Sequence, residues 1–299
     1  MDILTVRDLR KSFGDKQVLR GLELTVPERS VFGFVGRNGA GKTTTMKAVL
    51  GLLRPDGGEI RVAGERVAFG QTATNRFIGY LPDVPEFYSF MTAREYLRLC
   101  GESLRMERNE IETRSRELLE LVGLGKETHR IKGYSRGMKQ RLGIAQALIG
   151  RPKLLICDEP TSALDPIGRR EILDVLLSVR EQTTVLFSTH ILSDVERICT
   201  DVALLHDGRI AMQGPVDVLK RARRPEEFAV ELMDSADTEQ LLNAFGGARR
   251  GENGSVILPG SEAEMAAALE FIRGRGLSLR RMERAETSIE SLFLEVVQK

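Results

Sequence analysis

Hydrophobic and polar residues alternate along the start of the chain with the period of antiparallel strands. The alternation runs through residues 3–13 and 17–27, on either side of the polar turn formed by Gly14, Asp15 and Lys16. Because a period of two places successive side chains on opposite faces of a strand, two such runs around a glycine turn predict a β-hairpin. Residues 59–62 repeat the alternation, and we expect them to form a further edge strand.

Four short apolar runs with hardly any polar interruption form a second pattern, at residues 31–35, 154–157, 184–187 and 202–205. Such runs are typical of parallel strands that helices cover on both faces. Segments long enough for helices separate them. We therefore predict an α/β fold with a mostly parallel core sheet and an antiparallel β subdomain.

Leucine and isoleucine recur at three- and four-residue spacing within a long, charged stretch at residues 92–124. This is the period of helices with one apolar face. We expect a helical subdomain inserted between the strands, spanning about residues 88–150.

The pattern changes near residues 221–225, and from residue 228 short strand-like and helix-like segments follow one another. This predicts a first domain over residues 1–220 and a small α+β domain over 226–299. The basic cluster at the boundary could contact lipid phosphate or nucleic acid, but a short run of basic residues beside a proline is usually a solvated linker, and we assign it no function.

The last predicted helix carries an apolar stripe, Ile289, Leu292, Phe293 and Val296. Such a stripe usually belongs to a hydrophobic core. The alternative is that the small domain packs against a second copy of itself.

Composition narrows the classes of function. The 299 residues include 44 basic and 43 acidic side chains, a net charge of +1, which excludes a strongly basic nucleic-acid-binding domain. The three cysteines lie far apart without a C-x-x-C pair, so we expect neither a disulfide framework nor a zinc site, and a reducing compartment. No run approaches the roughly 20 apolar residues needed to cross a bilayer, so we expect any membrane role to come through a partner.

A glycine-rich loop follows the apolar run at 31–35 and precedes a helical stretch. It fits G-x-x-x-x-G-K-[ST] and consists of Gly36, Arg37, Asn38, Gly39, Ala40, Gly41, Lys42 and Thr43, with Thr44 next. Glycines let backbone N–H groups close around a phosphate, and the helix N-terminus adds partial positive charge. We expect the loop to bind ATP, with Lys42 at the β- and γ-phosphates and Thr43 on Mg²⁺.

Two adjacent carboxylates, Asp158 and Glu159, end the apolar run at 154–157. The carboxyl ends of parallel strands form the ligand-binding edge of such a sheet. Asp158 is suited to hold Mg²⁺, and Glu159, directed to the other side of the strand, to polarise an attacking water.

Together with these two motifs, further segments resemble the ATPases of the ATP-binding cassette (ABC) family. Tyr134-Ser135-Arg136-Gly137-Met138 stands where the family has its signature motif. Ser162, Ala163, Leu164 and Asp165 match its D-loop, His190 its histidine switch, and Phe13 the aromatic residue that stacks on adenine. The resemblance extends over residues 1–215 and places the elements in the family's order.

The resemblance implies roles for these residues. The family's signature serine and glycine, here Ser135 and Gly137, contact the γ-phosphate of ATP on another subunit, so the active form is a head-to-tail dimer. His190 contacts the γ-phosphate and fixes the geometry of Glu159. Ser162 and Asp165 communicate across the dimer.

Four positions depart from the family's usual sequence: Asp83 and, in the signature motif, Tyr134, Arg136 and Met138. Asp83 stands where a glutamine contacts both magnesium and the transporter partner, and Arg136 replaces the first signature glycine. We expect Asp83 to ligate Mg²⁺ through oxygen. These features, with the C-terminal segment 288–294, resemble the bacterial branch that serves drug, antibiotic-peptide and polysaccharide exporters.

The resemblance therefore implies an ATPase subunit at the cytoplasmic face of the cell membrane. It would work beneath a separate transmembrane permease, as a homodimer or paired with another cassette. The alternative is a soluble ABC ATPase acting on ribosomes or DNA. Such proteins usually carry two cassettes or a long coiled coil, and this chain shows one cassette and no sustained heptads, so no nucleic-acid partner is expected.

Overall fold

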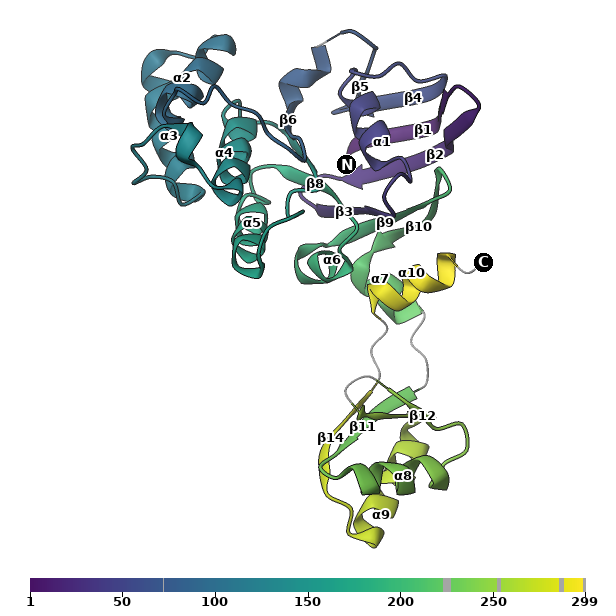
Figure 1. The fold of residues 1–299 in the computed structure, drawn as a ribbon. Coiled ribbons are helices and arrows are strands. Elements are labelled where there is room, and N and C mark those ends of the chain that lie inside the picture. The colour runs from purple at the N-terminus through teal and green to yellow at the C-terminus, as the bar shows by residue number, and fades with distance from the viewer. Residues whose placement is uncertain (72, 223–226, 252–253, 285–287, 298–299) are drawn as a thin grey trace. The chain divides into compact units, whose positions relative to one another are not determined.

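The structure is a computed structural model that describes all residues except 72, 223–226, 252–253, 285–287 and 298–299. It divides into two compact units (Figure 1). The first comprises Met1–Val216 together with Phe293–Lys299, and the second Asp217–Leu292. The division differs from the sequence-based limits of 1–220 and 226–299, chiefly because the C-terminal residues group with the first unit. Periodicity identifies a helix, but it does not identify the unit on which that helix packs.

A six-stranded sheet forms the centre of the first unit. Its order is β10-β9-β3-β8-β7-β6, and all neighbouring pairs are parallel except β10 with β9. The strands are β3 (Val31–Gly36), β6 (Ile78–Leu81), β7 (Leu154–Asp158), β8 (Thr184–Thr189), β9 (Asp201–His206) and β10 (Arg209–Pro215). Because every residue of β3, β7 and β8 is buried, these strands carry no polar face, as their sequence predicted.

A second, antiparallel sheet has the order β2-β1-β4-β5. Its strands are β1 (Asp2–Phe13), β2 (Lys16–Pro27), β4 (Gly57–Val62) and β5 (Glu65–Arg66). The expectation that residues 59–62 form an edge strand is wrong, because β4 lies between β1 and β5. A two-residue strand such as β5 is too short to show a period.

Apolar side chains of this second sheet share one core with the central sheet and with α1 (Lys42–Val49). Leu4 and Leu22 of the hairpin belong to the same buried cluster as Phe34 of β3 and Met46 of α1. This core fixes the hairpin and α1 around the glycine-rich loop that joins β3 to α1.

The helical insert contains α2 (Ala93–Ser103), α3 (Arg108–Leu121), the short 3₁₀ helix η2 (Ile131–Gly133) and α4 (Arg136–Leu148). Figure 1 shows these helices beside the central sheet, next to the β6 edge. The insert begins with a capping box, in which Thr92 accepts from the Glu95 amide and Glu95 accepts from the Thr92 amide. Two more helices, α5 (Pro166–Ser178) and α6 (Leu192–Ile198), follow β7 and β8.

The second unit contains a four-stranded antiparallel sheet of order β12-β13-β11-β14. Its elements are β11 (Glu227–Leu232), α8 (Ser235–Ala244), β12 (Arg249–Arg250), β13 (Val256–Pro259), α9 (Glu262–Arg275) and β14 (Leu279–Arg284). It has its own core, formed among others by Phe228, Val230, Leu241, Leu258 and Ile272. An α+β arrangement was predicted for this part of the chain.

Three shorter elements complete the described chain: η1 (Ala73–Phe77), α7 (Val216–Ala222) and α10 (Ile289–Val297). In α10, Ile289 and Leu292 are buried, as the apolar stripe suggests, and the side chain of Val296 lies outside the description. Most of the basic boundary cluster, from residue 223 onward, also falls outside the described residues.

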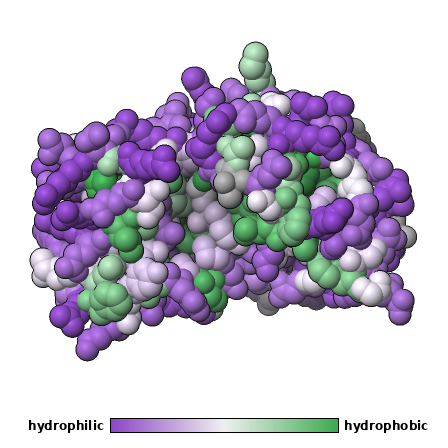
Figure 2. Space-filling view, turned by 90° about the horizontal axis from the view of Figure 1, so that it is seen from above, coloured by the Kyte–Doolittle hydropathy of each residue, from purple (hydrophilic) through white to green (hydrophobic). Residues whose placement is uncertain are grey.

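None of the helices that the structure describes is long and apolar enough to span a bilayer. The face seen in Figure 2 is mainly hydrophilic, with apolar residues in separate small groups. Cys100, Cys157 and Cys199 are free thiols, and burial raises the pKa of each above its ordinary value. Burial thus keeps all three thiols in the protonated form.

Candidate functional site

The glycine-rich loop turns tightly between β3 and α1. Gly39 and Gly41 have φ angles of 80° and 112°, in the left-handed region that other residues rarely adopt. A Cβ at Gly41 would also lie 2.8 Å from Leu19 Cδ2, and one at Gly36 would lie 2.9 Å from the Leu205 carbonyl oxygen. Glycine is therefore favoured by backbone conformation at Gly39, by packing at Gly36 and by both at Gly41.

This turn presents a helix N-terminus to solvent. The first amides of α1 have no acceptors within the helix, so they are available to an anion. Arg37, Asn38 and Gly39 are exposed, as is the Thr43 side chain, while Ala40 and Thr44 are half-buried. A phosphate group can reach the loop from outside.

Lys42 provides a nearly buried cation at the centre of the site. Its side chain is 6% exposed, and its Nζ donates to the carbonyl oxygen of Gly36 at 2.7 Å. Nζ also forms an ion pair with Glu159 Oε1 at 3.1 Å. Lys42 thereby joins the phosphate loop to the end of β7.

Asp158, the last residue of β7, and Glu159, the first residue after it, point to different surroundings. The Ser188 hydroxyl on neighbouring β8 donates to Asp158 Oδ1 at 2.6 Å and accepts from the Glu159 amide at 3.0 Å. Asp158 is only 3% exposed, and among the described residues no basic side chain forms an ion pair with it. A buried carboxylate without a countercharge fits the oxygen-ligand chemistry of Mg²⁺.

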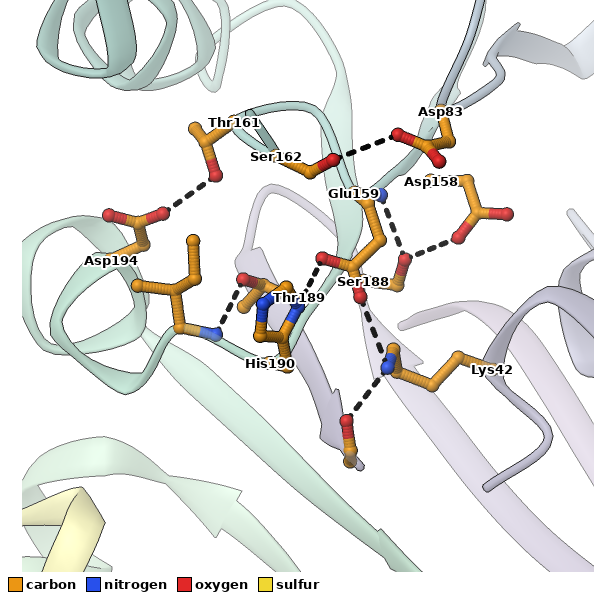
Figure 3. A network of polar contacts seen from close by, with 12 residues as sticks. Lys42, Asp83, Asp158, Glu159, Thr161, Ser162, Ser188, Thr189, His190 and Asp194 are labelled. Atoms are coloured by element: carbon orange, nitrogen blue, oxygen red, sulfur yellow. Dashed lines mark hydrogen bonds and ion pairs between the residues drawn. The ribbon is translucent and has the colours of Figure 1, made fainter. Parts of the chain in front are cut away.

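Glu159 lies between two nitrogen-bearing side chains (Figure 3). One carboxylate oxygen contacts Lys42, and the other lies 2.9 Å from His190 Nδ1. These contacts orient the carboxylate in a partly buried position, where it can accept a proton from a water molecule. The neighbouring Tyr80 stays protonated, because burial and the charge of Asp158 raise the pKa of Tyr80 to about 12.

The loop after β6 meets the loop after β7. The Ser162 hydroxyl donates to Asp83 Oδ1 at 3.0 Å, and Arg136 lies 3.6 Å from the same oxygen. The buried Gln140 side chain donates to the Asp83 carbonyl oxygen at 2.6 Å. Asp83 is thus bound to Ser162 and to the first turns of α4, and its expected role as a magnesium ligand stays a prediction.

The signature residues stand at the start of α4. The Ser135 hydroxyl caps this helix by accepting from the Met138 amide at 3.2 Å. Among the described residues, a Cβ at Gly137 would approach no atom closer than 3.8 Å, so no contact there requires glycine.

Asp165 and Phe13 take no part in the described contacts around Glu159. Asp165 is the N-cap of α5 and accepts from the Gly168 amide at 2.7 Å. Phe13, at the end of β1, is 51% exposed, with Lys11 Nζ 5.3 Å from its ring centre. Among the described residues, no hydrogen bond or ion pair links Phe13, Ser135 or Asp165 to the contacts around Glu159.

Four residues near the site have no role in the sequence analysis: Ser188, Thr161, Asp194 and Arg169. Ser188 immediately precedes Thr189 and His190, yet its contact with Asp158 depends on the pairing of β7 with β8. Thr161 donates to Asp194 at 2.7 Å, and Arg169 pairs with Asp194 at 2.6 Å. No short motif contains both partners of any of these contacts.

Comparisons with known proteins agree on one family. The family model described as "ABC transporter" matches residues 19–162. The ABC transporter ATP-binding protein YxlF of Bacillus subtilis (strain 168) is 38% identical over 299 residues, covering 99% of both chains. The bacitracin transport ATP-binding protein BcrA of Bacillus licheniformis is 34% identical over 302 residues, covering 99% of this chain and 97% of its own.

Solved structures show the same likeness. An ATP-binding subunit of an ABC transporter superposes with a TM-score of 0.66 at 33% identity, covering 74% of this chain and 92% of its own. CbiO1 of Clostridium perfringens is described as part of the ABC transporter complex cbiONQ. It superposes with a TM-score of 0.68 at 26% identity, covering 74% of this chain and 91% of its own.

Proposed function

The chain belongs to the ATP-binding proteins of the ABC transporter family, and from this premise we propose how its residues hydrolyse ATP and couple hydrolysis to transport. The ATP-binding proteins of this family are ATPases, and this chain is one of them. The observation that carries the proposal is the bridging of Lys42 and His190 by Glu159.

The phosphate loop is the proposed ATP site. The amides from Gly36 to Thr44 and the Lys42 ammonium supply donors and positive charge for the β- and γ-phosphates. Mg²⁺, when bound, neutralises phosphate charge, and Thr43 and Asp158 would hold it, with Asp83 as the third expected ligand. Phe13 offers an exposed ring for stacking on adenine.

Glu159 is the proposed catalytic base. Its carboxylate accepts the proton of the attacking water, while His190 holds that carboxylate by a 2.9 Å contact and is itself partly exposed. Lys42 already contacts Glu159, so the phosphate-binding cation and the base lie within one cluster.

A head-to-tail pair of cassettes is the proposed active form. Ser135 and Gly137 would complete the site of the other copy, and the open space at Gly137 supports this. Ser162 and Asp165 follow Glu159 closely in sequence, which suits them to communication across the pair. The second cassette is either another copy of this chain or a related one.

We further propose a separate membrane permease and export as the direction of transport. The signature residues Ser135, Arg136 and Gly137, and the acidic Asp83, support this branch, as does full-length similarity to two bacitracin transport ATP-binding proteins. The chain would then lie at the cytoplasmic face of the membrane.

The loop after Asp83 is the proposed permease contact. It carries three exposed apolar side chains, Val84, Tyr88 and Phe90. Beside them lies a hollow of about 450 Å³ that Asp83 and Arg136 help to line. Apolar side chains clustered at the surface are typical of interaction sites, and this loop leads directly from β6 to the helical insert.

Two substitutions test the ATPase proposal. Lys42→Ala removes the cation of the phosphate loop, so we expect loss of tight ATP binding in calorimetry.

Glu159→Gln preserves the shape of the side chain and removes the base. We therefore expect ATP binding near wild type, turnover reduced by at least about a hundredfold, and an ATP-dependent dimer in size-exclusion chromatography. Wild-type turnover by Glu159→Gln would show that another group is the base.

A further inference from the structure

The backbone at Glu159 is in an unusual conformation. Its φ angle is 49°, in the left-handed region that a residue with a side chain adopts only when its surroundings hold it there. On the β8 side the Glu159 amide donates to the Ser188 hydroxyl at 3.0 Å. The chain that follows Glu159 is held by the Ser162–Asp83 bond and by a second anchor toward α6.

Thr161 provides this anchor. Its hydroxyl donates to Asp194 Oδ2 at 2.7 Å, and both residues are almost completely buried. Asp194 lies in the first turn of α6, four residues after His190. This bond joins the segment after Glu159 to the segment after His190 (Figure 3), in addition to the direct contact between Glu159 and His190.

Arg169 neutralises the buried carboxylate. Its Nε lies 2.6 Å from Asp194 Oδ1, and another of its nitrogens donates to the Ser193 hydroxyl at 2.9 Å. Both carboxylate oxygens are thus used by strong, directional bonds, as a buried charge requires. Arg169 belongs to α5, so the contact fixes a third segment at the same point.

We infer that Asp194 is a positioning residue for ATP hydrolysis, holding the turn at Glu159 and the segment of His190 in fixed relation through Thr161. Among the described residues, no hydrogen bond or ion pair joins Asp194 to Lys42, Glu159 or His190, so it acts through the backbone. The phosphate loop is carried by other elements, β3 and α1. Loss of the anchor should therefore slow the chemical step and spare ATP binding. The inference rests on the proposed role of Glu159.

Thr161→Val tests it, because valine removes the hydroxyl at nearly constant shape and leaves the Asp194–Arg169 pair intact. In the full-length chain with Mg·ATP, we expect kcat per folded chain to fall about tenfold, with the ATP dissociation constant within about twofold of wild type. Thr161→Ser retains the hydroxyl and should restore most of the lost kcat.

Thr184→Val is a matched control. Thr184 is another buried threonine of the central sheet, whose hydroxyl accepts from the Arg29 amide at 2.8 Å at the opposite end of β8. It should lower the melting temperature without changing kcat per folded chain. Wild-type kcat in Thr161→Val, or an equal fall in both valine variants, would overturn the inference alone. Normal turnover by Glu159→Gln would overturn the proposed function, and this inference with it.

Discussion

At the scale of single residues, Asp83 and Arg136 are the positions where the chain departs from the usual family residues by gaining charge. The family's glutamine and glycine are neutral, and the structure places their charged replacements 3.6 Å apart. Both side chains are half exposed, so the pair is weak and screened by salt. The side chains of Asp83 and Arg136 therefore interact weakly through their opposite charges.

A charge reversal tests this coupling. Arg136→Glu puts a second carboxylate beside Asp83, and we expect ATP turnover at low salt to fall roughly fivefold, equivalent to about 1 kcal/mol. Adding Asp83→Asn should recover most of the loss, because the amide oxygen still accepts from Ser162. Raising the salt concentration should also shrink the defect. A defect that neither change relieves would show that Arg136 acts on a group other than Asp83.

Single residues of the site differ in whether the sequence alone could predict their roles. Asp158, Glu159 and His190 stand at strand ends and Lys42 at the start of α1, each inside a short motif, so residue type and position together predict them from the sequence. The contact that Ser188 makes with Asp158 cannot be predicted in this way. Its contact with Asp158 exists because Asp158 of β7 stands opposite Ser188 of β8, and this register is set by packing along the whole sheet.

At the scale of elements, the closeness of α4 and β6 determines where the signature motif stands relative to Asp83. A Cβ at Gly79 of β6 would lie 2.1 Å from the carbonyl oxygen of Ala147 in α4. A Cβ at Gly143 of α4 would lie 2.4 Å from a methyl carbon of Leu81. Two glycines thus permit the helix to approach the strand at backbone distance.

Gly79→Ala should therefore force the two elements apart. We expect the free energy of unfolding to fall by about 1–3 kcal/mol, as is usual when a methyl group is inserted into a packed contact. The measurement is chemical denaturation, compared with Gly57→Ala. Gly57 is also a strand glycine of the first unit, but its added Cβ would meet only Arg10 side-chain atoms at 3.8 Å or more. Equal stability of the two variants would contradict the close approach.

Long strands and helices with a clear period were predictable from the sequence, and very short strands were not. The long hairpin and the buried parallel strands were identified from sequence, and the second unit was recognised as a mixture of short strands and helices. The strands β5 and β12 were missed, since two residues cannot display a period. The position of β4 between β1 and β5 was missed for the same reason.

At the scale of the whole molecule, the second unit contains none of the nucleotide-binding motifs that the sequence analysis identified. It has its own buried cluster, including Phe228, Leu241 and Ile272, so its removal should not open the core of the first unit. A separately folded extension of an ATPase can hold subunits together when ATP has left. We propose that this unit strengthens the association of two cassettes or links hydrolysis to the permease.

Deletion of residues 226–299 tests this role. We expect the remaining cassette to bind ATP near the wild-type affinity, because the phosphate loop and Lys42 are retained, and to associate more weakly or lose stimulation by the permease. Analytical ultracentrifugation without nucleotide, and ATPase assays with and without permease, measure the two effects. A second variant should replace residues 226–287 by a flexible linker and keep 288–299, because Phe293–Lys299 group with the first unit. If this variant behaves like the full chain, the effect of deletion belongs to the final helix. If both shortened chains match the full chain in association and stimulation, the unit has neither role.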